Sequence, residues 1–245
     1  MRNIKLVIEY IGANYNGYQK QPKGKTIQGC LEKALQELFN EEITTYASGR
    51  TDAGVNALGQ VVNFTTNATM PAEKMAIAIN HHLPGDIRVV SSEQVYMNFN
   101  SRFSAKSKTY IYKICTSEQL SVFDNKRYLH YPYPIDLDLL KQACQKLVGK
   151  HDFSSFMSTG GPEKLSTIRT IYDAHVDIQD NYITFEITGN GFLYNMVRII
   201  VGTILEIARG KKKLDVFDAL YQGNCRNLAG KTVEPYALYL KQVNY

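Results

Sequence analysis

The sequence has no tryptophan, only 4 cysteines and only 5 histidines among its 245 residues. The cysteines lie far apart and form no CxxC pair, which argues against a zinc site or a thioredoxin-like motif. Free thiols in a reducing cytosol are the simplest account of them. No glycine-rich loop that would cradle a phosphate is evident. The four cysteines are Cys30, Cys115, Cys144 and Cys225.

Long apolar runs are also missing. The first ten residues, MRNIKLVIEY, contain too short an apolar run for a signal peptide. The most apolar long segment, 192–208, carries Asn195, Arg198 and Glu206, so we do not expect it to span a membrane. Hydrophobic residues make up 44% and charged residues 21%, as in ordinary globular domains. We therefore expect a cytoplasmic globular protein with one large domain or two smaller halves.

The positive charge is in small excess, with a formal net charge of +5, so its placement matters more than its size. Three basic clusters fall in predicted loops or beside a strand. Such clusters suit a phosphate backbone, and each also fits an ordinary solvated surface. The clusters are Lys20, Lys23 and Lys25; Lys106 and Lys108; and Lys211, Lys212 and Lys213.

Apolar periodicity predicts an α+β protein. The order of elements indicates two halves, 1–105 and 106–245, with mostly antiparallel sheets. In the first half we expect strands at 4–10, 43–47, 60–65 and 87–95 and helices at 27–38 and 71–82, and a further strand at 108–116 follows at the start of the second half. After a proline-containing linker we expect helices at 136–148, 192–209 and 214–221, a hairpin of 168–177 with 182–188, and a final strand at 236–242.

The segment SGRTDAGVNALGQVVNF places an arginine and an aspartate one residue apart between two glycines. An aspartate in such a turn commonly hydrogen-bonds its own backbone, which is the structural interpretation of Asp52. Arg50 is close enough in sequence to pair with Asp52 and keep it ionised. Gly49 and Gly54 permit strained turns and close approach of a substrate. The segment therefore also fits a carboxylate that attacks carbon at a sugar or an activated ring.

Arg198 is a second candidate, on the helix predicted at 192–209. At 3.6 residues per turn it falls opposite the apolar face, on a strip with Asn195 and Gly202. We expect Gly191 and Gly202 to leave open space beside it. Its guanidinium is then either an ordinary surface group or a group that holds a carboxylate or phosphate with two hydrogen bonds.

Tyr110 is a third candidate, because it shares a strand face with Tyr112. Tyrosines on strands are usually core or half-buried residues, which is the default interpretation. A tyrosine can also stack on a flipped base and present its phenol to a ring proton. The pair His151–Asp152 is weaker evidence for a metal site, since such a site needs three or four ligands.

These motifs together resemble the TruA family of tRNA pseudouridine synthases. The segment SGRTDAGVNALGQVVNF is similar to the family's active-site motif, and FNSRFSAKSKTYIYKI is similar to the segment with its active-site tyrosine. NGYQKQPKGKTIQGCLEKAL resembles the family's N-terminal basic loop and helix. HDFSSF, TIRTI, GNGFLYNMVRIIVGTILEIARG and ALYL resemble later blocks. The blocks run in family order from about residue 10 to residue 240.

The resemblance implies the pseudouridine synthase fold. In that fold two α/β halves join mostly antiparallel sheets into one central sheet, with helices packed on it and the active-site cleft between the halves. It also implies an isomerase that converts uridine to pseudouridine in the anticodon stem-loop of tRNA, at positions 38, 39 and/or 40. Such enzymes work as homodimers with no metal or cofactor.

Transferred by position, the resemblance makes Asp52 the catalytic nucleophile and Arg50 its partner and the residue that extrudes the base. Tyr110 stacks on the base and handles a proton, and Arg198 is a second partner of Asp52. RNA contacts are then expected at Lys20, Lys23, Lys25, Arg102, Lys106, Lys108, Lys211, Lys212 and Lys213.

The chain departs from the family pattern at several positions. Asn56 stands where the family usually has histidine, FNSRFSA where FHARFSA is usual, and NGYQ where HGWQ is common. These departures spare the four catalytic positions but bear on RNA contacts and target choice. Three alternatives stay open: a paralogue with a different uridine target, an RNA-binding module of this fold without catalysis, and a metal-dependent nuclease or phosphohydrolase using His151 and Asp152.

Overall fold

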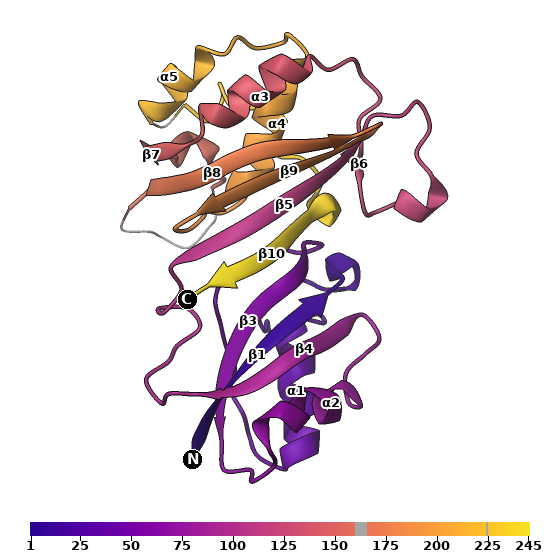
Figure 1. Cartoon of the computed structure of the whole chain (residues 1–245), viewed down its shortest axis with the longest axis vertical. Coiled ribbons are helices and arrows are strands. Elements are labelled where there is room, and N and C mark those ends of the chain that lie inside the picture. Colours follow the sequence, from indigo (N-terminus) through magenta and orange to yellow (C-terminus); the bar gives the residue numbers. More distant parts are fainter. Residues whose placement is uncertain (160–165, 224) are drawn as a thin grey trace. The chain divides into compact units, whose positions relative to one another are not determined.

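The computed structural model describes residues 1–159, 166–223 and 225–245 and divides into two compact units. The first unit contains Met1–Lys106 together with Tyr239–Tyr245, and the second contains Ser107–Leu238. The sequence-based division had placed residues 239–245 with the second half, whereas their contacts place them in the first unit. Each unit has its own strands and helices (Figure 1).

The first unit is built on a mostly antiparallel sheet with the strand order β4-β1-β3-β10. β1 (Arg2–Tyr10) pairs antiparallel with β3 (Asn56–Thr66) and β4 (Ile87–Val95). Two further strands, β2 (Tyr46–Ala47) and β10 (Leu238–Asn244), pair with β3, antiparallel and parallel respectively. Alternate residues of β1 are fully buried, as its apolar pattern predicted: Ile4, Leu6 and Ile8.

The helices of the first unit begin where the sequence carries helix-start signals. In α1 (Ile27–Phe39) the Thr26 hydroxyl accepts a hydrogen bond of 3.2 Å from the amide of Gly29, which satisfies one of the free amides of the first turn. Pro71 directly precedes α2 (Ala72–Asn80), which packs on β4. A short 3₁₀ turn, η1 (Gly12–Asn14), follows β1.

The second unit contains a mostly antiparallel set of strands of its own. Its order is β5-β9-β8-β7, and β6 pairs parallel with β5. The hairpin predicted around residues 179–181 is confirmed, and alternate residues of its second strand are buried. The strands are β5 (Ser107–Cys115), β6 (Leu129–His130), β7 (Gly149–Asp152), β8 (Ile168–Gln179) and β9 (Tyr182–Gly189).

Three helices belong to this unit, in which α3 packs on β8 and on α4 (Figure 1). They are α3 (Leu137–Gln145), α4 (Met196–Ala208) and α5 (Val216–Tyr221), and the 3₁₀ turns are η2 (Val122–Asp124), η3 (Ser154–Phe156) and η4 (Pro235–Ala237). The predicted helix start at 192 was wrong, because Asn195 adopts a left-handed φ of 60° and the helix begins after it. Over the described ranges, no helix has the length and apolar character needed to cross a bilayer.

Candidate active site

Asp52 lies in the loop that joins β2 to β3. Its side chain is half-buried, while the neighbouring Arg50 is exposed. The amide of Val55 donates a hydrogen bond of 3.1 Å to the carbonyl of Asp52, and Gly54 completes this turn with a φ of 79°. Glycine adopts that conformation at the lowest cost, so the turn itself favours a glycine after Ala53. The turn fixes the backbone on the C-terminal side of the carboxylate.

Thr51 fixes the other side of Asp52. Its hydroxyl shares a hydrogen bond of 2.7 Å with the phenol of Tyr10, and its carbonyl accepts a hydrogen bond of 3.0 Å from the amide of Tyr18. Burial raises the pKa of Tyr10 to about 12, although the contact with Thr51 opposes part of that rise. The phenol therefore stays neutral near pH 7 and serves as a buried hydrogen-bonding support for the loop.

Gln60 anchors the start of the same loop. It is completely buried, and its amide group donates a hydrogen bond of 2.9 Å to the carbonyl of Gly49. Its carbonyl oxygen accepts a hydrogen bond of 2.7 Å from the hydroxyl of Ser48. A buried amide with both ends satisfied holds a single conformation, because breaking either bond leaves an unpaired polar group. The residues before Asp52 are thereby fixed to β3.

Asn56, the departure from the family's usual histidine, points into the protein. It is 3% exposed, and its side-chain oxygen accepts a hydrogen bond of 2.9 Å from the amide of Gly12. Gly12 itself sits against the loop, since a Cβ there would lie 2.1 Å from the carbonyl oxygen of Val55. This position therefore supports the Asp52 loop from inside the first unit.

Tyr110 lies on β5, opposite Ile187 of β9. Its ring is half-buried and meets Phe192 edge to face, with ring centroids 5.0 Å apart and planes at 80°. Tyr112, two residues on, is completely buried and donates a hydrogen bond of 2.8 Å to the carbonyl of Glu234. Of the two tyrosines, Tyr112 is thus the core residue, and Tyr110 keeps part of its surface open to solvent.

Arg198 lies in the first turn of α4, where two hydrogen bonds orient its guanidinium. Nε donates to the carbonyl of Val233 at 2.6 Å, and Nη1 donates to the side-chain oxygen of Asn195 at 2.7 Å. Among the residues that the structure describes, no acceptor is recorded for Nη2, so this nitrogen is available to a carboxylate or phosphate. The expected open space at Gly202 was wrong, because a Cβ there would lie 1.9 Å from the carbonyl of Lys231.

Arg50 and Asp52 belong to the first unit, whereas Tyr110 and Arg198 belong to the second. Asp52 is held through the turn of its own loop. Tyr110 contacts Phe192, and Arg198 donates to Asn195 and Val233, in each case within the same unit. The pairing of Arg198 with Asp52 and the base-stacking role of Tyr110 stay predictions.

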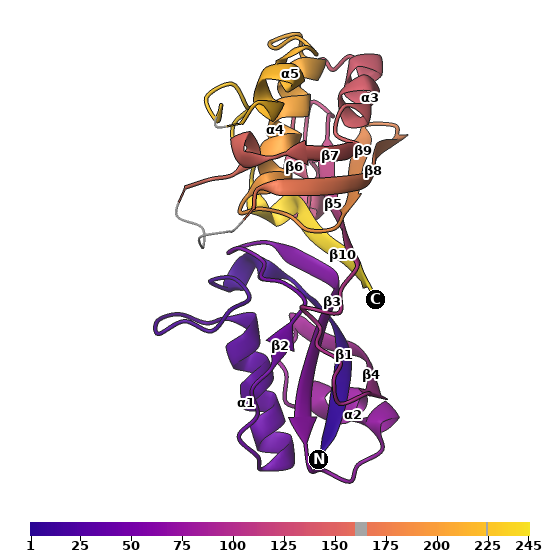
Figure 2. The same cartoon turned by 90° about the vertical axis from the view of Figure 1, so that its left-hand side faces the viewer.

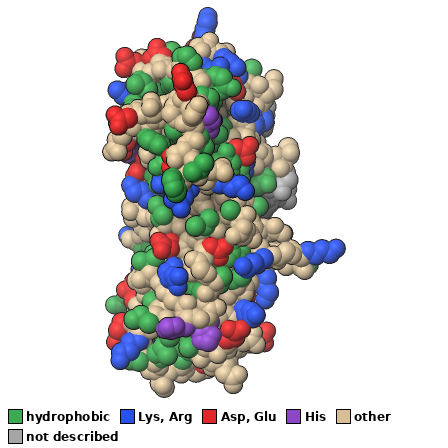
Figure 3. Space-filling model, turned by 90° about the vertical axis from the view of Figure 1, so that its right-hand side faces the viewer, with side chains coloured by type: hydrophobic (Ala, Val, Ile, Leu, Met, Phe, Trp, Pro, Cys, Tyr) green, Lys and Arg blue, Asp and Glu red, His purple; other side chains and the backbone are tan. Residues whose placement is uncertain are grey.

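The basic residues predicted to contact RNA differ in their partners. The loop 15–25 projects from the first unit, and Lys or Arg side chains lie on this projection (Figures 2 and 3). Within it Lys23 is exposed, Lys25 lies over the ring of Tyr15 at 4.8 Å, and Lys20 pairs with Glu32 at 3.4 Å. All three lysines are exposed, but an ammonium that already has an ion-pair partner is a weaker candidate for phosphate binding than one without.

The other basic candidates are mostly exposed. Arg102, Lys106, Lys211 and Lys213 have exposed side chains, and Lys108 is half-buried. The guanidinium of Arg102 lies 5.4 Å from the ring centre of Phe103. Lys212 pairs with Glu206 at 3.4 Å, so it is the least accessible of its cluster.

His151 and Asp152 have local structural partners. The ring of His151 stacks on Tyr221 at 4.0 Å, and the carboxylate of Asp152 accepts a hydrogen bond of 2.8 Å from the amide of Ser154. No group of three or more His, Cys, Asp or Glu side chains arranged to hold a metal occurs in the described part of the chain. The four cysteines are all unpaired thiols.

A hollow of about 350 Å³ lies in the second unit, away from the predicted site residues. Its lining includes Pro132, Tyr133, Ile135, Ile178 and Ile183. None of the four predicted catalytic residues lines it, so we do not assign the reaction to it.

Three supporting residues were missed from the sequence: Gln28, Glu32 and Gln60. Gln28 and Glu32 lie four residues apart beside the buried face of α1, and Glu32 is only 9% exposed. A glutamate at the edge of an apolar helical stripe was the available signal, since buried charges require partners. Gln60 gave no comparable signal. Polar residues normally alternate with apolar ones along a strand, so Gln60 resembled an ordinary residue on the exposed face.

The chain matches the family model described as tRNA pseudouridine synthase over residues 6–104 and 143–245, which include Asp52 and Arg198 but not Tyr110. It is 43% identical over 245 residues to "tRNA pseudouridine synthase A" of Caldicellulosiruptor bescii, covering 100% of both chains. It is 42% identical, again over the full length of both, to "tRNA pseudouridine synthase A 2" of Clostridium perfringens.

A solved structure of an archaeal box H/ACA sRNP Nop10–Cbf5 complex aligns with 82% of this chain and 44% of that chain. Its TM-score of 0.34 and 10% identity are too low to add to the assignment. The family model and the full-length relatives suffice, and they confirm the fold predicted from the motifs. The chain therefore belongs to the tRNA pseudouridine synthase family and is by class an isomerase.

Proposed function

We propose that this chain converts uridine to pseudouridine at positions 38, 39 and/or 40 of the tRNA anticodon stem-loop, with Asp52 as the catalytic carboxylate. The observation that carries the proposal is the family match across nearly the whole chain, with the GRTDAG segment on a tightly held loop. Such a loop presents a carboxylate in one defined orientation, which catalysis requires.

The reaction rearranges one nucleoside without any net change in composition. The bond between N1 and C1′ breaks, the uracil turns, and a bond forms between C5 and C1′. C5 loses its proton and N1 gains one, so no oxidant, reductant or metal is needed to balance the step. A carboxylate either adds to C1′ or assists departure of the base, and a base then removes the C5 proton. Asp52 fits the role of the carboxylate in both routes, addition to C1′ and assisted departure of the base.

The other three residues have complementary roles. Tyr110 keeps a partly exposed ring braced by Phe192, which suits stacking on an extruded base. Arg50 is exposed on the same loop as Asp52, where it can occupy the space that the base leaves in the helix. Arg198 is already oriented by two hydrogen bonds, so its remaining nitrogen can hold an anion at little entropic cost.

The substrate is a tRNA, and the partners follow from that assignment. Exposed basic side chains on the loop 15–25 and after α4 supply the electrostatic contacts, so that binding weakens with salt. We further propose a homodimer, because the family resemblance implies that two subunits hold one tRNA. We place the protein in the cytoplasm with its substrate.

The proposal is tested by the release of tritium from tRNA that carries [5-³H]uridine, since C5 loses its hydrogen in the reaction. We expect Asp52→Asn and Asp52→Ala to abolish release while the Kd for tRNA changes less than about tenfold, because phosphate contacts dominate affinity. Asp180→Asn is the matched control, since Asp180 is an exposed turn residue. Normal turnover by the Asp52→Ala variant would contradict the assignment of Asp52 as the catalytic carboxylate.

Mapping the product by carbodiimide treatment and primer extension identifies the target uridines. Pseudouridine at 38, 39 or 40 supports the proposal. Pseudouridine elsewhere identifies a paralogue with a different target, and tRNA binding without any tritium release identifies a module that has lost catalysis. Release that stops on adding a chelator would instead indicate a metal-dependent activity.

A further inference from the structure

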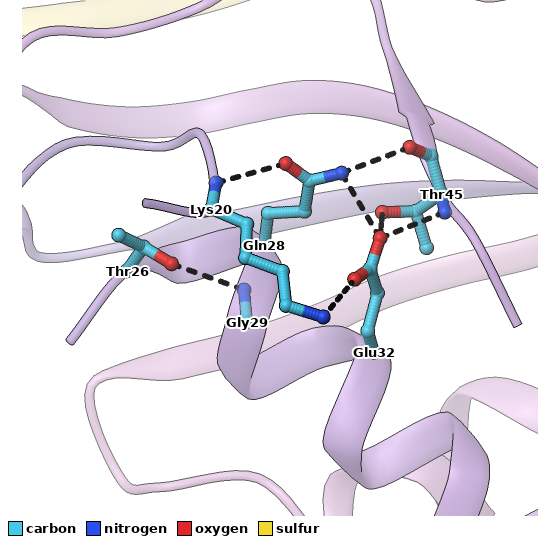
Figure 4. A network of polar contacts seen from close by, with 6 residues as sticks. All are labelled: Lys20, Thr26, Gln28, Gly29, Glu32 and Thr45. Carbon is cyan, nitrogen blue, oxygen red and sulfur yellow. Dashed lines mark hydrogen bonds and ion pairs between the residues drawn. The ribbon is translucent and has the colours of Figure 1, made fainter. Parts of the chain in front are cut away.

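Glu32 is a nearly buried carboxylate that receives four hydrogen bonds or ion-pair contacts. Oε1 accepts from the side-chain amide of Gln28 at 2.9 Å, from the amide of Thr45 at 3.0 Å and from the hydroxyl of Thr45 at 3.1 Å. Oε2 lies 3.4 Å from Nζ of Lys20 (Figure 4). A carboxylate with this number of donors is held firmly in one position, because charge-assisted hydrogen bonds are stronger than those between neutral groups.

The four contacts reach two different segments. Thr45 directly precedes β2, the strand from which the chain enters the Asp52 loop. Lys20 belongs to the projecting loop 15–25, which Gln28 also holds by accepting a hydrogen bond of 3.0 Å from the amide of Lys20. One side chain of α1 thus ties the basic loop to the segment that leads to Asp52.

The basic loop also lies directly against the peptide of Asp52. The amide of Gln28 donates to the carbonyl of Tyr18 at 2.8 Å, and the amide of Tyr18 donates to the carbonyl of Thr51 at 3.0 Å. At Gly17 the backbones come so close that a Cβ would lie 2.9 Å from the Thr51 carbonyl oxygen. Displacing the stem of the basic loop therefore displaces the backbone that carries the catalytic carboxylate.

Resting on the proposed function, we propose that Glu32 is a positioning residue for the isomerisation. It holds the basic loop and the Asp52 loop in one fixed relation, so that a tRNA bound to the loop is also correctly placed for the carboxylate. Lys20 then acts through Glu32 and not as a phosphate ligand. Small errors in position are costly in such reactions, since misplacement by about 1 Å can lower a rate about 100-fold.

The test compares Glu32→Ala with Glu37→Ala, a matched control on the same helix whose carboxylate pairs at the surface with Lys33 at 3.7 Å. Single-turnover tritium release is measured with enzyme well above the Kd, alongside the Kd and thermal unfolding. We expect Glu32→Ala to slow the step at least tenfold with the Kd within threefold, and Glu37→Ala to stay within twofold of the unaltered protein.

Lys20→Met keeps the test decisive if Glu32→Ala does not fold, because Lys20 is largely exposed. We expect it to slow the single-turnover step at least threefold and to leave the salt dependence of binding unchanged. If both variants fold, the double variant should be no slower than Glu32→Ala alone, since the two residues act as one unit.

Three results would overturn this inference: a Glu32→Ala rate within twofold of the unaltered protein, a loss explained by the unfolded fraction, or a loss confined to the Kd. A Lys20→Met variant with a normal rate and a lower salt slope would do the same. If the unaltered protein releases no tritium, the proposed function itself has failed, which is a distinct outcome.

Discussion

The side-chain oxygen of Asn56 accepts a hydrogen bond of 2.9 Å from the backbone amide of Gly12. This contact lies inside the first unit, directly behind the turn that carries Asp52. The residue that departs from the family's usual histidine is thus a support of the loop. Its side chain is too deeply buried to contact RNA directly.

Asn56→Ala should lower stability and leave target choice unchanged. The substitution removes the acceptor for a buried amide, which costs about 1–3 kcal/mol in free energy of unfolding. Urea unfolding measures the loss, and pseudouridine mapping of total tRNA measures the targets. Asn125→Ala, at an exposed position, is the control. A new set of modified uridines with unchanged stability would contradict the structural role of Asn56.

Gly17→Ala should damage both stability and turnover. Gly17 has a φ of 85°, and the added methyl group would meet the backbone of Thr51 at 2.9 Å. We expect a loss of about 1–3 kcal/mol and a single-turnover rate at least tenfold lower. Gly85→Ala is the matched control, because no atom lies within 4 Å of a Cβ at Gly85. Equal behaviour of the two variants would show that the close approach at Gly17 has no consequence.

Arg198→Ala should lower turnover far more than stability. Two partly buried hydrogen bonds are lost, which costs about 1–3 kcal/mol, whereas we expect the rate to fall at least 100-fold. Arg226→Ala is the comparison, since Arg226 makes two similar hydrogen bonds in the same unit, to Gly230 and Thr232. If both variants lose stability and activity equally, Arg198 is a structural residue only.

Asp86 should make stability depend on pH in the acid range. Burial alone would raise the pKa of its carboxyl, but hydrogen bonds from Tyr15 and Asn14 outweigh that effect and lower the pKa below its ordinary value. A lowered pKa stabilises the folded state above the unfolded pKa of about 3.9, and this contribution disappears as the pH falls through the folded value.

Asp86→Asn should therefore unfold more easily than the unaltered protein at pH 7, by about 1 kcal/mol. The difference should begin to shrink below about pH 4, where the unfolded chain takes up the proton, and should vanish below the folded pKa, where the folded protein also carries a neutral group. Urea unfolding at a series of pH values measures it, with the exposed Asp180→Asn as control. Parallel stability curves for Asp86→Asn and the unaltered protein would refute the predicted linkage.

The lysines after α4 should contribute unequally to tRNA binding. Lys211 and Lys213 are exposed, whereas Lys212 pairs with Glu206 at 3.4 Å. Replacing Lys211 or Lys213 by alanine should reduce the slope of log K against log salt by up to about 1, and replacing Lys212 should reduce it less. Filter binding at several salt concentrations measures the slopes, with Lys33→Ala on α1 as control. Unchanged slopes for all three would remove this cluster from the RNA surface.

Local signals in the sequence were enough to predict most of the helices and strands. Thr26 caps α1 as predicted, Gly210 follows α4 with a φ of 71°, and the turn at 179–181 joins β8 to β9. These features depend on neighbouring residues, so a single sequence contains the information. The strand predicted at 43–47 is shorter, Tyr46–Ala47, because only these residues pair with β3.

Features that depend on distant residues could not be predicted in this way. The parallel pairing of β10 with β3 joins residues about 180 positions apart, at Tyr239 and Asn56. The crowding at Gly202 arises from Lys231, so the helical wheel wrongly indicated open space. The same holds for the candidate site: the GRTDAG motif made Asp52 the predicted catalytic residue, but the buried residues that support its loop come from β1, α1 and β3.

The pairing of β10 with β3 has a consequence for how the protein is made. Residues 239–245 are synthesised after the whole second unit, yet Tyr239 and Leu240 among them pair with β3, the strand that begins four residues beyond Asp52. Tyr245 also contacts the first unit, where its hydroxyl donates a hydrogen bond of 2.8 Å to the carbonyl of Ser101. A nascent chain therefore lacks one strand of the first unit until the whole second unit has been translated, and the first unit can pair all its strands only after residues 239–245 have been synthesised.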